Sequence, residues 1–185
     1  MLSFCLPKSS KWKQNLMKHL ITILAITSMT NATIAQNSKA TTVKTTFHRE
    51  TSVSIEIKAD PAIVWTLLTK ASDYPRWNTT IISIEGNIAL GEKIRLKSIL
   101  DTNRTFKLKV KEFESEKKLV WGDGQGNRVY TITKNDNSTV TFSMTEKIGG
   151  LMFPMYAKMI PPFDQSFEQF ASDLKKESET IMNAK

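Results

Sequence analysis

The sequence of 185 residues contains little cysteine and little histidine. Cys5 is its one cysteine, and its two histidines are His19 and His48. If the first 35 residues are removed, as argued below, the remaining chain can form no disulfide, no thiolate nucleophile and no site in which cysteine holds a metal. One histidine is too few for a multi-histidine zinc site and argues against a Ser-His-Asp triad. We therefore expect no metal and no cofactor.

Acidic residues are missing from the first 35 positions, which contain four lysines and then the apolar run LITILAIT. A basic region, a short apolar run and a small-residue site such as Thr33-Ile34-Ala35 are together typical of a signal peptide. The run is shorter than the roughly 20 residues that span a bilayer. We expect residues 1–35 to be cleaved, with Met17 as an alternative start, and the protein to be periplasmic or secreted, without a stable transmembrane segment. The alternative is a basic tail that lies on a membrane surface.

The 150 residues that follow Ala35 are enough for one domain with a substantial core. The formal charge falls from +8 to +4 without the four leader lysines, so the case for nucleic-acid binding loses its main support. We divide this part into a polar leader, residues 36–50, and a domain, residues 51–185, which we expect to be monomeric.

Seven segments of the domain have the pattern of strands, and two short helices separate the first from the second. TSVSIEIKA alternates apolar and polar residues, which predicts a half-buried strand over 51–59. Asp60-Pro61 then predicts a capped helix, and Ser72-Asp73 predicts the cap of a second, shorter one. The other six strands are expected at 81–86, 92–100, 104–114, 117–122, 128–134 and 138–148, and their short connections imply antiparallel neighbours.

Lysine and apolar side chains alternate along 93–97 and 107–111, which indicates one wet and one buried sheet face. A solvated face is the simpler interpretation of these lysines, and an anionic membrane dock is the alternative. At the C-terminus, an apolar stripe at helical spacing predicts a long helix that buries Phe163, Phe167, Phe170, Leu174 and Ile181.

The order of these motifs resembles the SRPBCC (START-like, Bet v 1-like) superfamily, in particular its polyketide cyclase/dehydrase and lipid-transport branch. The resemblance rests on residues 53–68, Tyr74-Pro75-x-Trp77-Asn78, the Gly91 turn, Leu119-Val120-Trp121, Glu146 before Gly149-Gly150, and the closing helix. It implies an α+β helix-grip fold, in which a seven-stranded antiparallel sheet wraps around the long C-terminal helix and leaves a pocket between them. Members include carriers, cyclases and co-chaperones, so the fold alone does not fix the function.

Pro161-Pro162 departs from the pattern of the family, whose last helix usually continues without interruption. Because a proline pair inside a helix removes backbone donors, we expect the helix to begin afresh near Phe163. LMFPMYAKMI, residues 151–160, then becomes a separate apolar segment over the pocket. Its methionines and Met144 are expected either to adapt to a ligand or to fill gaps in the core.

Glu146 is the most informative polar residue, because its strand parity points it inward with Phe142 and Met144. A buried carboxylate needs a partner, and Arg128 or Tyr130 on the preceding strand could provide one. Glu146 is then either a polar anchor for a ligand or a structural, strand-end carboxylate. If the protein is an enzyme, Glu146, Tyr130 and Arg128 are the candidate catalytic residues.

The leading hypothesis is a domain that binds a small hydrophobic or amphipathic ligand such as a lipid. The residues expected to face that ligand are Ile82, Ile84, Leu96, Phe106, Leu108, Trp121, Tyr130, Phe142, Met144, Glu146, Phe167 and Phe170. One alternative is an enzyme similar to polyketide cyclases or dehydratases, with Glu146 as acid or base. Another is a protein-binding module whose core is filled by the same residues.

We predict that the mature protein begins at Gln36, because Thr33-Ile34-Ala35 fits the rule for signal-peptide cleavage. Intact-mass measurement and N-terminal sequencing of the protein from its native host will show this residue first. A chain that begins at Met1 or Met17 would contradict the export hypothesis.

Overall fold

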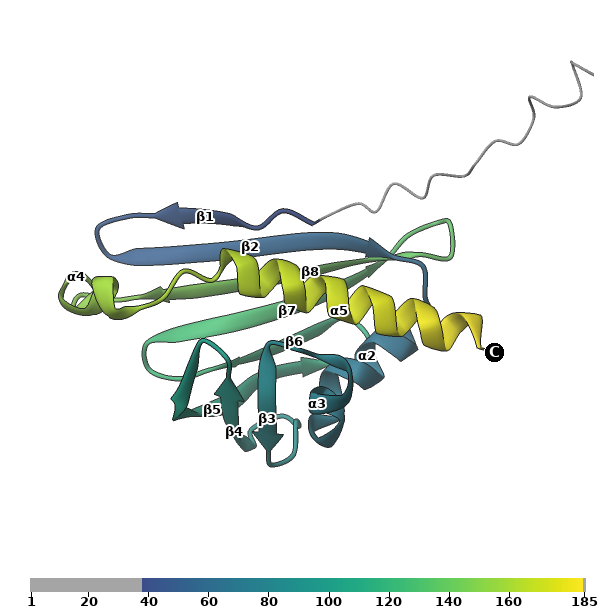
Figure 1. The fold of residues 1–185 in the computed structure, drawn as a ribbon, viewed down its shortest axis with the longest axis horizontal. Coiled ribbons are helices and arrows are strands. Elements are labelled where there is room, and N and C mark those ends of the chain that lie inside the picture. The colour runs from purple at the N-terminus through teal and green to yellow at the C-terminus, as the bar shows by residue number, and fades with distance from the viewer. Residues whose placement is uncertain (1–37, 185) are drawn as a thin grey trace, which may run out of the picture. The chain divides into compact units, whose positions relative to one another are not determined.

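The computed structural model describes residues 38–184, so the expected signal peptide and its cleavage site lie outside the described residues. The described chain contains an eight-stranded antiparallel sheet in the order β1-β2-β8-β7-β6-β5-β4-β3 (Figure 1). Its strands are β1 (Thr41–Lys44), β2 (His48–Ile57), β3 (Ile81–Glu85), β4 (Lys93–Ser98), β5 (Asp101–Glu114), β6 (Lys118–Gly122), β7 (Gly126–Lys134) and β8 (Val140–Gly149).

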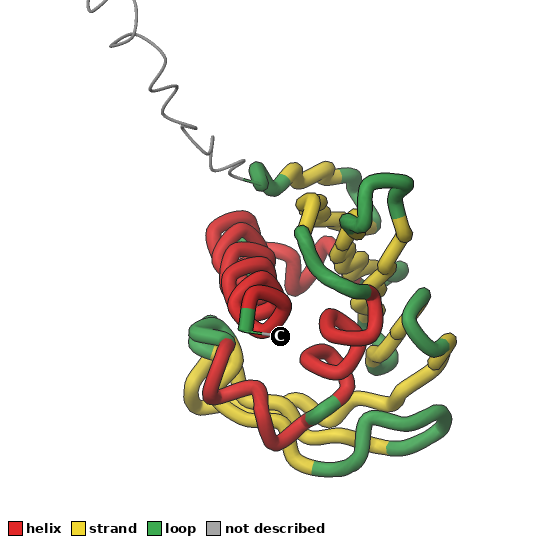
Figure 2. Tube along the Cα trace, turned by 90° about the vertical axis from the view of Figure 1, so that its right-hand side faces the viewer, coloured by secondary structure: helices red, strands yellow, loops and turns green. Residues whose placement is uncertain are grey.

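The helices cover one face of this sheet. They are α2 (Pro61–Thr69), α3 (Tyr74–Trp77), α4 (Phe153–Tyr156) and α5 (Asp164–Asn183), with 3-10 turns at Ala71–Asp73 and Ala157–Met159. Figure 2, which views α5 nearly end-on, shows the strands curving around the helices. The expected α+β helix-grip architecture is confirmed. None of the helices in residues 38–184 is long and apolar enough to cross a membrane.

The first strand was not predicted, because TTVK is short, polar and without a clear alternation. It pairs with β2, and Thr42 donates a hydrogen bond of 2.8 Å to Asp164 on α5. The backbone N–H of Ala40 likewise donates to Glu168, at 2.9 Å. The expected polar leader, residues 36–50, therefore includes β1 and the start of β2, and the sheet has eight strands instead of seven.

The two short helices lie where the sequence predicts them, but only the first has the expected cap. Asp60 caps α2, since its Oδ1 accepts the Ala62 N–H at 2.8 Å. Asp73 was expected to cap α3. It lies at the N-cap position of α3 as predicted, but its carboxylate accepts a hydrogen bond of 3.0 Å from Arg76 and makes no capping bond to the backbone.

The centre of the fold is an aromatic cluster around Phe170 of α5. Its ring lies 5.6 to 6.4 Å, centroid to centroid, from four aromatic rings on α3, β7 and β8. Phe163, Phe167 and Leu174 extend the same buried face along the helix, and Ile181 is half-buried. The predicted helix face and its start after the proline pair are confirmed. Because this face fills the middle of the curved sheet, any hollow must lie elsewhere.

Candidate ligand-binding site

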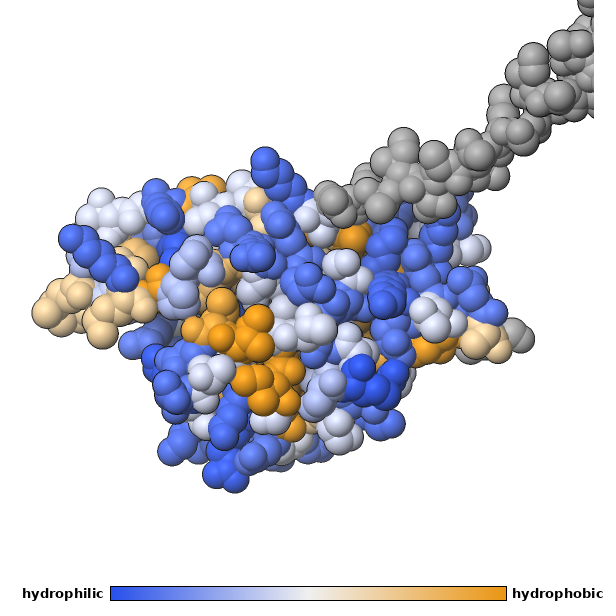
Figure 3. Space-filling view, viewed as in Figure 1, coloured by the Kyte–Doolittle hydropathy of each residue, from blue (hydrophilic) through white to orange (hydrophobic). Residues whose placement is uncertain are grey.

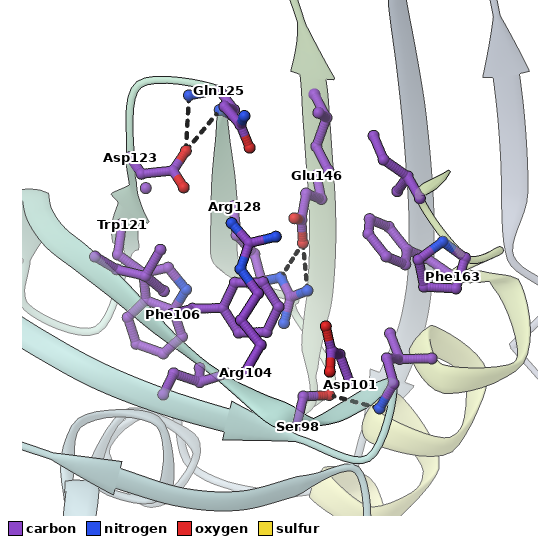
Figure 4. Close-up of a pocket in the computed structure, with 18 of the residues that line it drawn as sticks. Ser98, Asp101, Arg104, Phe106, Trp121, Asp123, Gln125, Arg128, Glu146 and Phe163 are labelled. Carbon is purple, nitrogen blue, oxygen red and sulfur yellow. Dashed lines mark hydrogen bonds and ion pairs between the residues drawn. The ribbon is translucent and has the colours of Figure 1, made fainter. Parts of the chain in front are cut away.

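A cavity of about 320 Å³ lies at the end of the sheet where α5 begins (Figure 4). It is bounded by the β4–β5 and β6–β7 turns, the adjoining strand ends of β4 to β8, and the connector between β8 and α5. Its lining residues are Leu96, Ser98, Leu100, Asp101, Arg104, Phe106, Leu108, Trp121, Gly122, Asp123, Gln125, Gly126, Arg128, Glu146, Ile148, Tyr156, Met159, Ile160, Pro161 and Phe163.

One wall of the cavity is apolar because of strand alternation. Leu96 on β4 is directly opposite Phe106 on β5, and the pair that follows along β5 brings in Leu108. The intervening side chains, such as Lys107, point outward and are exposed. Trp121 closes the wall at the end of β6, where it is buried. The result is a surface on which an apolar molecule can pack.

The opposite wall carries an ion pair. Arg128 on β7 and Glu146 on β8 are register partners, and the Nε and Nη2 of Arg128 donate to Glu146 Oε2. Each side chain is only 17% exposed. Burial disfavours the charged guanidinium, but the Glu146 carboxylate and Tyr130 together outweigh this effect and raise the pKa of Arg128. The site therefore presents a fixed, charged donor beside a carboxylate.

Arg49 holds the connector over the cavity. Its Nη1 donates to the carbonyl of Ile160 at 3.1 Å, and its Nη2 donates to the carbonyl of Pro161 at 2.7 Å. The guanidinium also lies 4.5 Å from the ring centre of Phe163. Burial lowers the pKa of Arg49, and the charges of Glu146 and Asp164 oppose this effect. Arg49 thereby bonds two carbonyls of the segment between the 3-10 turn Ala157–Met159 and α5.

The sequence prediction missed Arg49, which it had placed in the polar leader. One signal was available, because Arg49 has the same strand parity as Val53 and Ile55. Extending the alternation of β2 by four residues would have placed it on the inner face. Ser98 and Asp101 were also missed, because they end β4 and begin β5 where a register shift breaks the alternation. Asp123 and Gln125 were missed because they lie in the β6–β7 turn, where strand parity gives no direction.

The predicted site residues divide into three groups. Leu96, Phe106, Leu108, Trp121 and Glu146 line the cavity, as does Arg128. The residues that are buried in the core and do not line this cavity are Ile84, Tyr130, Phe142, Met144, Phe167 and Phe170. The expected pocket is thus confined to the end of the sheet.

Ile82 is the exception, because its side chain is 41% exposed and outside the cavity. A register shift between Ile81 and Ser83 in the β3–β4 pair breaks the alternation. Ile81 and Ile84 both point inward as a result, and the inward orientation predicted for Ile82 was wrong.

The connector forms the roof, as expected for residues 151–160. Tyr156, Met159 and Ile160 line the cavity from this side. The Tyr156 hydroxyl donates to the carbonyl of Gly149 at 3.2 Å, which ties the roof to the end of β8. Within residues 38–184, the structure contains no cluster of three or more His, Cys, Asp or Glu side chains that could hold a metal ion.

Comparison with known proteins agrees with this fold. Residues 48–179 match the family model described as polyketide cyclase / dehydrase and lipid transport. The chain belongs to this family, a branch of the SRPBCC (START-like) superfamily. Curated proteins provide no sequence match.

Solved structures are similar in fold at low sequence identity. A conserved protein of unknown function from Enterococcus faecalis has a TM-score of 0.57 and 15% identity, over 77% of this chain and 78% of its own. A START superfamily protein from Mycobacterium smegmatis has a TM-score of 0.52 and 14% identity, over 71% and 98%. A hypothetical protein from Helicobacter pylori has a TM-score of 0.56 and 18% identity, over 69% and 86%.

Tyr130 makes stability sensitive to high pH. Burial raises the pKa of Tyr130, and the Arg128 charge only partly opposes this. As the pH rises above the ordinary value of about 10, the unfolded tyrosine ionises first, so stability falls by up to about 1.4 kcal/mol per pH unit for each such group. Burial also raises the pKa of Tyr74, so this residue adds a similar fall of stability with pH.

We therefore predict that Tyr130→Phe reduces the loss of stability between pH 10 and 11 by about half of the tyrosine contribution. Urea unfolding of both proteins at pH 8, 10 and 11 measures this difference. Tyr156→Phe, at a half-buried roof position, is the control and should leave the slope unchanged. Equal slopes for wild type and Tyr130→Phe would contradict the prediction.

Proposed function

We propose that the chain binds a small hydrophobic or amphipathic molecule, such as a lipid, in this cavity. The observation that supports the proposal is an apolar wall from β4, β5 and β6 facing one ion pair, Arg128–Glu146. Ligand sites are usually apolar hollows of about 300–1,000 Å³ with a few fixed polar groups, and this cavity lies at the lower end of that range. A compact molecule, or one end of a longer one, suits its size.

The ion pair would orient the ligand. Arg128 has further N–H donors that can bind a hydroxyl, carbonyl or acid group, and Glu146 can accept from a hydroxyl. The apolar part of the ligand would then pack on Phe106 and Leu108 across the cavity. In this role Glu146 acts as an anchor, as the sequence suggested.

An enzyme of the cyclase or dehydratase type is the second candidate, since the family description includes both activities. Glu146 would be its acid or base and faces the cavity. Protonating Glu146, however, would disrupt its bond to Arg128. Tyr130 lies behind the lining, and its raised pKa makes it a poor base at neutral pH. Binding therefore needs fewer assumptions than catalysis, and we propose that it takes place outside the cytoplasm, after export.

The cavity is tested by native mass spectrometry of the purified protein and by uptake of an amphipathic dye, 1-anilinonaphthalene-8-sulfonate. We expect a bound small molecule or dye in wild type and its loss in Leu108→Trp, which places an indole in the cavity. Leu90→Trp is the matched control, because Leu90 is 65% exposed in the β3–β4 turn. A wild-type protein that carries no ligand and takes up no dye would overturn the proposal.

The anchor is tested by Glu146→Gln, which keeps the shape of the side chain and removes its charge. Arg128 then lacks its carboxylate, so we expect stability to fall by about 1–3 kcal/mol. Affinity for the extracted ligand should fall at least about tenfold if the pair contacts it. Glu85→Gln breaks an exposed pair with Arg95, at 3.2 Å, and should cost less than about 0.5 kcal/mol.

A double variant separates an anchoring role from a purely structural one. Arg128→Met combined with Glu146→Leu removes both charges, which should restore most of the stability. Ligand affinity should stay low in this protein. A double variant that binds as well as wild type, or a Glu146→Gln protein that keeps both stability and uptake, would eliminate the anchor.

A further inference from the structure

Large apolar side chains are exposed mainly at the cavity end of the sheet. Of the ten such side chains in the described part of the chain, six belong to the turns and the connector at this end: Phe47, Ile99, Leu151, Met152, Met155 and Met159. We call the last four the apolar tip; they are 88%, 60%, 75% and 82% exposed. In Figure 3 the end occupied by α4 has an apolar surface. Soluble surfaces rarely concentrate such side chains without a partner.

The structure holds the tip in its exposed position. Arg49 bonds the carbonyls of Ile160 and Pro161 behind it, and Tyr156 bonds Gly149 in front of it. The N–H of Gly150 donates to the carbonyl of Phe47 at 2.9 Å, which brings this exposed ring beside the tip. Phe153 is buried between tip residues and anchors the segment. Methionines at 152, 155 and 159 therefore do not fill the core, in contrast to the buried Met144.

The charges around the tip fit an anionic or zwitterionic lipid surface. Residues 148–163 contain no acidic residue and one base, Lys158, which is exposed. Lys44, at the end of β1, is exposed as well. The carboxylates close to this end are held inside the molecule or lie on the cavity lining: Glu146 is paired with Arg128, Asp164 accepts a hydrogen bond from Thr42, and Asp101 and Asp123 line the cavity. Lysines beside an apolar ridge can meet lipid phosphates while the ridge enters the acyl region.

A protein partner fits this surface less well. Stable interfaces bury about 20–30 residues on each side. The tip offers four side chains on a narrow connector. Methionine and leucine side chains without fixed polar neighbours are also poor at selecting one protein surface, whereas they adapt readily to lipid chains.

We infer that the apolar tip inserts into the surface of a lipid bilayer and that the cavity opens against the membrane. Met159 links the two features, because it is exposed on the tip and also lines the cavity. An apolar ligand could then pass between bilayer and cavity with little exposure to water. Contact of the tip with the membrane does not depend on the proposed function. The transfer of a ligand rests on the proposed function.

The test uses a fluorophore at the tip of the full chain. Cys5→Ser removes the one native thiol, and Met155→Cys carries the polarity-sensitive label NBD. Leu90→Cys carries the same label in the β3–β4 turn, at the other end of β4, as a matched control. We expect vesicles of phosphatidylcholine, alone or with phosphatidylglycerol, to shift the emission of label 155 to the blue, and nitroxide-bearing lipid to quench it. Label 90 should show neither effect.

A second variant links the signal to the tip. Leu151→Asp with Met152→Asp, in the protein labelled at 155, should weaken the partitioning of this label at least about tenfold, because two apolar side chains are lost. Urea unfolding shows whether this variant is folded. If it is not, Leu151→Ser with Met152→Ser makes the same test. Label 155 reports contact at the tip even if residues 1–35 bind vesicles by themselves.

Three results would overturn the inference. The first is a label 155 that stays in water with both kinds of vesicle. The second is a blue shift that grows with protein concentration in the absence of lipid, which would mean that a second copy covers the tip. The third is binding that survives the Asp substitutions and is lost in Lys107→Glu with Lys109→Glu, which would assign it to the basic sheet face. Leu108→Trp, for which we expect dye uptake to be lost, should leave the shift of label 155 intact. Failure of the cavity proposal can therefore be distinguished from failure of membrane contact.

Discussion

The buried face of α5 is the constraint on which the rest of the structure depends. Phe170 contacts aromatic rings from α3, β7 and β8, and Phe167 and Leu174 lie fully buried on either side. A sheet that curves around so bulky a stripe has little free volume beneath the helix. The cavity described above lies before the first turn of α5, next to Phe163, which is the first aromatic residue of the stripe.

The polar groups of the site follow from the same boundary. The proline pair prevents a continuous helix, and Arg49 bonds the carbonyls of Ile160 and Pro161 in the break. The guanidinium of Arg49 lies 4.5 Å from the ring centre of Phe163, and that of Arg128 lies 5.1 Å from the ring centre of Phe167. Two guanidinium groups therefore pack against the start of α5. Glu146 lies close enough to both for its charge to favour their ionised forms. One carboxylate thus stabilises two cations, which explains why its replacement should affect stability and binding together.

Sequence periodicity predicted the architecture well because burial has a regular signature. Strand alternation and the spacing of the α5 stripe are local patterns, and they located every strand of the sheet but β1. The site was less predictable because it is made where patterns stop. A bulge turned Ile82 outward, turn residues such as Asp123 entered the cavity, and Arg49 acquired its role from a connector 111 residues away. Strand alternation indicates which face of the sheet a side chain is on. It does not show where core side chains already occupy that face and where a cavity remains.

The connector between β8 and α5 has an inner and an outer apolar face, and burial explains the inner face alone. Its inner side chains reduce contact of the cavity with water, which is the ordinary reason for an apolar roof. Its outer side chains remain in water, although polar residues there would have left the roof unchanged. Exposed Leu151 and Met155 therefore contribute little to the stability of the folded chain. Their presence beside the cavity is explained by an apolar phase outside the protein, which would make the roof a passage between two similar environments.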